Sequence, residues 1–269
     1  MNNPIRHQRG WFGRTLVAAL LALASIVTAP SVAALDNLDE AVDMAGRQRM
    51  LSQRIAKYYF QKGIGARTDV AETELTGSMG DFDSALGELK GFAPNGEVLA
   101  LLNEVDGEWQ KLKPLVSAEP DRTSALAVFE LSTSVLKRSH KVVVALEELS
   151  GKSKSGLINV SGRQRMLSQR LAALYMLRAW NFADESLSEQ YATTENEFAA
   201  GIETLSSAPQ TSAEIKSELR KLERNFKSFR RGADTGGKSV PSVMAHSAEK
   251  MLRQSQKIVT MYLALGDKA

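Results

Sequence analysis

The sequence contains no cysteine. Disulfides, thiol catalysis and thiolate metal sites are therefore excluded. Histidine is scarce as well, because only His7, His140 and His246 are present and none of them is itself repeated. We predict neither a metal site nor a histidine base. Glycine-rich phosphate loops and Gly-x-Ser-x-Gly elements are also absent, so we predict no cofactor and no enzymatic activity.

Residues 1–34 differ in composition from the rest of the chain. They hold three arginines and no acidic residue, then an apolar run over 16–27 and small residues at Val32 and Ala34. This pattern is typical of a secretory signal peptide, since a run of about 12 residues is too short to span a bilayer. We expect cleavage after Ala34 and a periplasmic mature protein. Without this segment, basic and acidic residues balance at 31 each, which argues against a nucleic-acid partner.

The remaining sequence shows helical periodicity and no alternating strand pattern. Breaks between the helical stretches fall at glycine or proline, except for one at Asp184-Glu185. They divide the sequence into eight stretches, at 37–63, 69–91, 96–116, 122–150, 155–184, 186–207, 211–232 and 240–266. The two halves repeat each other. We therefore predict an all-α fold of two tandem antiparallel four-helix bundles related by internal duplication, covering residues 35–151 and 152–269.

The clearest sign of duplication is a nine-residue identity. The motif Gly-Arg-Gln-Arg-Met-Leu-Ser-Gln-Arg occupies residues 46–54 and returns unchanged at 162–170. Residues 136–143 align with 252–259 at the same offset of 116. A helix that needed only an apolar core would conserve its apolar positions and let its surface change. The retention of arginines and glutamines therefore indicates a repeated site.

On a helix with about 100° per residue, the motif has two faces. One face is predicted to form the core of its own bundle and carries Met44, Gln48, Leu51, Ile55 and Tyr58. The nearly opposite face carries Gly46, Arg49, Met50 and Gln53, and in the second copy Gly162, Arg165, Met166 and Gln169. Glycine permits close approach of another backbone, so we expect these second faces to pack against each other.

The arginines on that interface have no acidic residue within the motif. Two buried guanidinium groups without counter-charge would each cost several kcal/mol. An anion held between Arg49 and Arg165 would remove that cost and accept forked hydrogen bonds from both. A small planar oxyanion such as nitrate or nitrite fits this arrangement. Alternatively, the motif arginines are surface residues that pair with acids on other helices.

The motif resembles the signature of a sensory domain found in nitrate/nitrite sensor histidine kinases and in type IV pilus methyl-accepting chemotaxis transducers, the NarX-like or PilJ-type domain. The matching positions are Ala45, Gly46, Arg49, Met50, Ser52 and Arg54, and in the second copy Gly162, Arg165, Met166, Ser168 and Arg170. That domain is an antiparallel four-helix bundle, and in the nitrate sensors two subunits each supply the arginine before methionine to one anion.

The resemblance implies a set of site residues. Arg49 and Arg165 would be direct ligands, with the backbone at Gly46 and Gly162 nearby. Gln48 and Gln53 depart from the nitrate sensors and bring the chain closer to the pilus transducers. The remaining ligand candidates are the motif's other outer-face residues and, as secondary candidates, its other arginines: Met50, Met166, Gln53, Gln169, Arg47, Arg54, Arg163 and Arg170.

Two functions remain open from the sequence. The first is a periplasmic protein that binds or senses a small anion such as nitrate or nitrite. The second is a ligandless helical interaction module that docks onto a membrane-bound sensor or transducer. The two motif copies either pair within one monomeric chain as a pseudo-dimer, or each pairs with its equivalent in a homodimer.

Overall fold

The computed structural model describes residues 35, 37–151, 153–234 and 241–265. The predicted signal peptide, residues 1–34, lies outside this part. The described residues form eight α-helices and no strand: α1 (Leu38–Gly63), α2 (Thr68–Phe92), α3 (Gly96–Ser117), α4 (Arg122–Ser150), α5 (Ser153–Ala179), α6 (Glu185–Ser207), α7 (Ala213–Asp234) and α8 (Pro241–Leu263). The all-α prediction is confirmed. Within the described ranges, none of the helices has the length and apolar composition to cross a membrane.

Most predicted helix ends fall within two residues of the observed ones, and the largest error is at the end of α5. This helix ends at Ala179 rather than at 184. Asn181 adopts a left-handed conformation with φ 62°, and the Asp184 side chain accepts a hydrogen bond from the Leu187 amide as the N-cap of α6. Both features stop helical propagation before 184. Helix α8 also ends early, at Leu263 rather than at 266.

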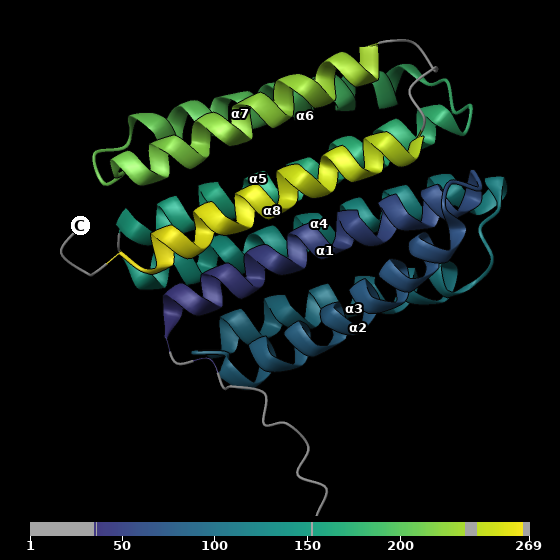
Figure 1. Cartoon of the computed structure of the whole chain (residues 1–269). Coiled ribbons are helices and arrows are strands. Elements are labelled where there is room, and N and C mark those ends of the chain that lie inside the picture. Colours follow the sequence, from purple (N-terminus) through teal and green to yellow (C-terminus); the bar gives the residue numbers. More distant parts are fainter. Residues whose placement is uncertain (1–34, 36, 152, 235–240, 266–269) are drawn as a thin grey trace, which may run out of the picture. The chain divides into compact units, whose positions relative to one another are not determined.

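The two repeats pack as two bundles joined along α1 and α5 (Figure 1). In the first repeat α1 contacts α2 and α4, and α3 contacts α4; in the second, α5 contacts α6 and α8, and α7 contacts α8. Helices α1 and α5 contact each other, and α4 and α8 each also touch the motif helix of the other repeat. The motif helices therefore lie at the centre, while α2, α3, α6 and α7 lie outside.

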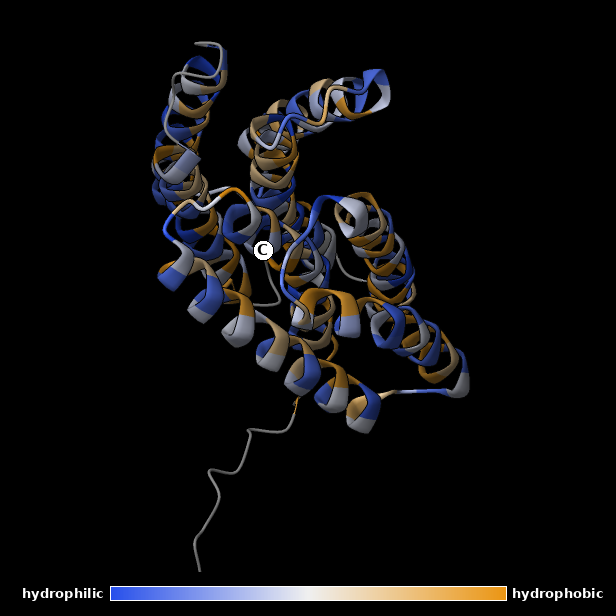
Figure 2. Ribbon diagram, turned by 90° about the vertical axis from the view of Figure 1, so that its right-hand side faces the viewer, coloured by the Kyte–Doolittle hydropathy of each residue, from blue (hydrophilic) through white to orange (hydrophobic). Residues whose placement is uncertain are grey.

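This central position explains why α1 is buried on more than one side. Helices carry both hydrophobic and hydrophilic residues (Figure 2), as amphipathic packing requires. On the predicted core face, Leu51 and Ile55 are fully buried, and Gln48 Nε2 donates to the Phe82 carbonyl of α2 at 3.0 Å. On the opposite side, Gly46 faces the second repeat. At these positions the structure agrees with the prediction that one face of this helix packs in its own bundle and the opposite face meets the second repeat.

Gln53 does not follow the predicted division of faces. Its Nε2 donates to the Ser132 carbonyl of α4 at 3.0 Å, within its own bundle. Its Oε1 accepts from Arg170 Nη1 of α5 at 2.9 Å. The assignment of Gln53 to the α5-facing surface alone was therefore wrong, because its long amide reaches both neighbours.

Candidate functional site

Arg49 and Arg165 lie together between the two motif helices. Each is only 1% exposed. A Cβ atom placed on Gly46 would lie 3.3 Å from the Nη2 atoms of both arginines, so these two nitrogens can be no farther apart than twice that distance. A Cβ on Gly162 would lie 3.1 Å from Arg165 Nη2 and 3.7 Å from Arg49 Nη2. Glycine at both positions therefore makes room for the two guanidinium groups.

Equivalent backbone groups hold the two arginines. Arg49 Nη2 donates to the Asn159 carbonyl at 3.4 Å, and Arg165 Nη2 donates to the Asp43 carbonyl at 3.2 Å. Positions 43 and 159 are related by the repeat offset of 116. Each motif arginine thus reaches across to the other repeat in the same way, which gives the site a pseudo-twofold arrangement.

Two further residues complete this arrangement, and their roles were missed from the sequence. His140 Nδ1 lies 3.2 Å from Arg49 Nη1, and Gln256 Oε1 accepts from Arg165 Nη1 at 2.7 Å. A guanidinium group has no acceptor, so His140 Nδ1 must accept and its proton must sit on Nε2. The alignment of residues 136–143 with 252–259 was the available signal, because it places 140 and 256 at equivalent positions.

The charges of the two arginines are not balanced equally. Asp43 Oδ1 lies 2.6 Å from Arg165 Nη2, as an ion pair rather than a well-directed hydrogen bond. The expectation that neither arginine has a counter-charge is therefore wrong for Arg165, because Asp43 lies outside the motif. Among the described residues, no carboxylate pairs with Arg49, and its Nε has no hydrogen-bond partner.

The electrostatics of Arg49 reflect this imbalance. Burial, followed by the charges of Arg165 and Arg163, lowers the pKa of Arg49 to about 9. Burial, followed by the charges of Arg49 and Arg163, also lowers the pKa of His140. At neutral pH the site therefore combines a charged Arg49 with a neutral His140.

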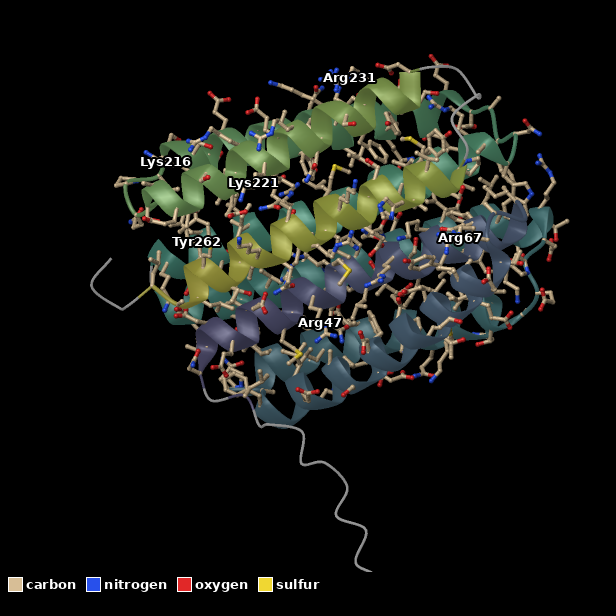
Figure 3. The ribbon with its side chains drawn as sticks, viewed as in Figure 1. Arg47, Arg67, Lys216, Lys221, Arg231 and Tyr262 are labelled. Atoms are coloured by element: carbon tan, nitrogen blue, oxygen red, sulfur yellow. The ribbon has the colours of Figure 1, made fainter. Side chains whose placement is uncertain are left out.

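Most of the secondary arginines have carboxylate partners. The pairs are Arg47 with Asp81 at 2.8 Å, Arg163 with Glu197 at 3.0 Å, and Arg54 with Glu74 at 2.7 Å and Glu249 at 3.3 Å. Arg47 lies where α1 faces α2 (Figure 3). Arg47 and Arg54 thus pair with acids on other helices, as the alternative interpretation of the motif predicts. Arg49 has no such partner among the described residues.

Arg170 is the exception among the secondary candidates. It donates to Gln53 Oε1 at 2.9 Å, to Thr133 Oγ1 at 3.1 Å and to Gln190 Oε1 at 2.7 Å. All three acceptors are neutral, and no carboxylate pairs with Arg170 in the part of the chain that the structure describes. Burial lowers the pKa of Arg170.

Comparison with protein families matches residues 32–130 and 150–260 to the type IV pili methyl-accepting chemotaxis transducer N-terminal family, PilJ. The chain belongs to the PilJ family. The two matched segments correspond to the two repeats, which supports the duplication and the pilus-transducer part of the resemblance. The family is a sensory one rather than a family of enzymes. No curated protein and no solved structure matches the chain.

The remaining candidates occupy different places in the two PilJ-type repeats. Met50 and Met166 are buried, and each lines a cavity beside the arginine pair. Gln169 Nε2 donates to Ser168 Oγ at 3.3 Å, and its Oε1 has no hydrogen-bond partner. Among the described residues, neither Gln53 nor Gln169 hydrogen-bonds to the arginine pair. The methionines therefore flank the pair, whereas the glutamines lie away from it.

Metal binding has no support from side-chain placement. No group of three or more histidine, aspartate or glutamate side chains in the described ranges could hold a metal ion. His246 is exposed on α8, and His140 is engaged with Arg49. The charged groups at the site are the Arg49 and Arg165 guanidinium groups and the Asp43 carboxylate.

Proposed function

We propose that the protein is a periplasmic sensory module that binds a small oxyanion, such as nitrate or nitrite, between Arg49 and Arg165. The observation that carries this proposal is the convergence of two almost fully buried guanidinium groups on the space between Gly46 and Gly162. Membership in a family of transducer sensory domains gives such a site a function in signal reception.

The charges favour a ligand with one negative charge. Arg49 and Arg165 contribute two positive charges, and Asp43 neutralises one of them. A monoanion such as nitrate or nitrite would neutralise the other. A dianion such as sulfate would leave excess negative charge in a buried site, which is costly. Planar oxyanions also match the forked donor geometry of arginine.

A ligandless interaction module remains a second candidate function. Both Nη atoms of each arginine already lie at hydrogen-bond distance from a protein acceptor: His140 and the Asn159 carbonyl for Arg49, and Gln256 and the Asp43 carbonyl for Arg165. This network could stabilise the contact between the bundles without a ligand. The protein would then serve as a helical scaffold that docks onto a membrane-bound sensor or transducer.

Thermal unfolding in the presence of different anions distinguishes the two functions. We would compare nitrate, nitrite, sulfate and chloride at constant ionic strength, using wild type, Arg49→Gln and the control Arg47→Gln. The control removes a charge from the same helix, at a side chain that is 43% exposed and paired with Asp81. A ligand at 100 times its Kd should add about 2.7 kcal/mol, or roughly 5–11 °C.

Oxyanion binding predicts that nitrate or nitrite raises the melting temperature of wild type and Arg47→Gln, but not that of Arg49→Gln. If no anion acts on wild type, or if Arg49→Gln responds as wild type does, the oxyanion site is wrong. The scaffold function would then be the better account of the arginine pair.

A further inference from the structure

Two cavities lie at equivalent positions beside the arginine pair. One, of about 270 Å³, is lined by residues of α1, α4, α5 and α6, including Arg49. The other, of about 510 Å³, is lined by residues of α1, α2, α5 and α8, including Arg165. Most lining positions of one cavity map onto the other through the repeat offset of 116. The two cavities therefore occupy equivalent places in the two repeats.

The first cavity, here called the basic cavity, has an excess of positive charge. Its basic residues are Arg49, Lys137, Arg163 and Arg170, and its one carboxylate is Glu197. Glu197 pairs with Arg163 at 3.0 Å. Among the described residues, the other three cations have no carboxylate at ion-pair distance. Glu147 and Asp43 act on Arg49 only at longer range.

The second cavity, here called the neutral cavity, contains four basic and four acidic residues. The basic residues are Arg47, Arg54, Arg165 and Arg253, and the acids are Asp43, Glu74, Asp81 and Glu249. Glu249 also pairs with the buried Lys57 of α1, whose equivalent in the second repeat is Ala173. Three of its four basic residues, Arg47, Arg54 and Arg165, therefore have carboxylate partners in the protein itself. Among the described residues, no carboxylate pairs with Arg253.

Two replacements account for most of the difference. Glu74 and Glu249, the partners of Arg54, correspond to Gln190 and Thr133, the partners of Arg170. The neutral replacements keep a hydrogen bond to Arg170 and so keep it in place. They do not neutralise its charge, which leaves a positioned, partly buried cation available to an external anion.

The other walls of the basic cavity suit a ligand with an organic body. Leu136 and Met166 supply apolar surface, and Thr193 and Thr194 add hydroxyl and methyl groups. A volume of about 270 Å³ lies just below the range of drug-sized pockets. An inorganic oxyanion would leave the apolar wall unused.

We propose that the basic cavity binds a small organic carboxylate, with Arg170 and Lys137 facing its negative charge and Leu136 and Met166 contacting its carbon chain. This site is distinct from the proposed oxyanion site, although Arg49, His140 and Met166 border both. It is present on one side of the molecule, because the neutral cavity supplies its own carboxylates.

Titration calorimetry with butyrate and glutarate as probes, at fixed ionic strength, tests this site. The first variant is Thr133→Glu, which places beside Arg170 the acid that the neutral cavity has at position 249. The second is Lys137→Gln, with Arg253→Gln as its control, because Lys137 and Arg253 are both exposed and occupy equivalent positions.

We expect wild type and Arg253→Gln to bind at least one probe equally well. Thr133→Glu should weaken binding at least about tenfold, since its carboxylate competes for a charge-assisted hydrogen bond, and Lys137→Gln should weaken it measurably. The proposal is overturned if wild type binds neither probe, if Thr133→Glu binds as tightly as wild type, or if Arg253→Gln loses as much as Lys137→Gln.

The two sites can fail independently. Thr133→Glu leaves Arg49 and Arg165 in place, so the rise in melting temperature with nitrate should persist in this variant. Conversely, Arg165→Gln should abolish the nitrate response and retain probe binding. Loss of only one response therefore identifies which of the two sites is wrong.

Discussion

Arg49 and Arg165 should differ in their contribution to stability, although each lies in the same nine-residue motif. Arg165 pairs with Asp43, whereas Arg49 has no carboxylate partner among the described residues. Replacing Arg165 with glutamine leaves a partly buried aspartate without its cation. Replacing Arg49 with glutamine removes a buried charge with which no described carboxylate forms an ion pair.

The magnitudes follow from these environments. Removing one partner of a buried ion pair costs about 3–5 kcal/mol, and the 21% exposure of the Asp43 side chain places Arg165→Gln near 3 kcal/mol. Arg49→Gln loses two hydrogen bonds at about 1 kcal/mol each. It also relieves the desolvation that lowers the pKa of Arg49 to about 9. These effects oppose each other, so the net change should lie within about 1 kcal/mol of zero.

Thermal unfolding followed by circular dichroism in anion-poor buffer measures this difference. With about 2–4 °C per kcal/mol for a chain of this size, a difference of about 2–4 kcal/mol means that Arg165→Gln should melt roughly 4–16 °C below Arg49→Gln. An Arg49→Gln variant that is as destabilised as Arg165→Gln, or more so, would refute the assignment of Asp43 as the counter-charge of Arg165 alone.

Two further predictions concern residues outside the arginine pair. Gly63→Ala should destabilise the fold by about 1–3 kcal/mol through overpacking, because the new Cβ would collide with the Trp180 ring. In contrast, a Cβ on Gly80 would meet nothing within 4 Å, so Gly80→Ala should stabilise α2 by up to about 1 kcal/mol. Urea titrations of both variants would measure these changes in the free energy of unfolding. Burial lowers the pKa of Lys57 to about 8 despite its pairing with Glu249. The unfolded state, with a lysine pKa of about 10.4, then binds more protons above pH 8, so Lys57 should contribute a rise in stability from pH 8 to pH 10. Unfolding of Lys57→Met should show a smaller rise than wild type across this range, and most clearly between pH 8 and pH 9, below the pKa of Arg49.

The fold and the arginine pair were predictable from two simple features. Helical periodicity together with glycine and proline breaks located the helices. The nine-residue identity at 46–54 and 162–170 located the two helices that meet, because residues retained on a non-core face indicate a shared contact. Glycine in the motif correctly indicated close approach, since Gly46 and Gly162 both face the guanidinium groups.

The charge distribution was not predictable from the motif, because it depends on residues that differ between the repeats. Asp43 balances one arginine, and its equivalent Asn159 does not balance the other. Similarly, Thr133 takes the place that Glu249 has in the other repeat. These residues lie on other helices or outside the motif, so only tertiary packing brings them to the site.

Isothermal titration calorimetry of the protein with nitrate tests the central claim most directly. Because Arg49 and Arg165 converge on one place, the account predicts saturable binding of one nitrate per chain. No binding would contradict the claim that the arginine pair is an oxyanion site, and two nitrates per chain would contradict the claim that the two motif copies share a single ligand.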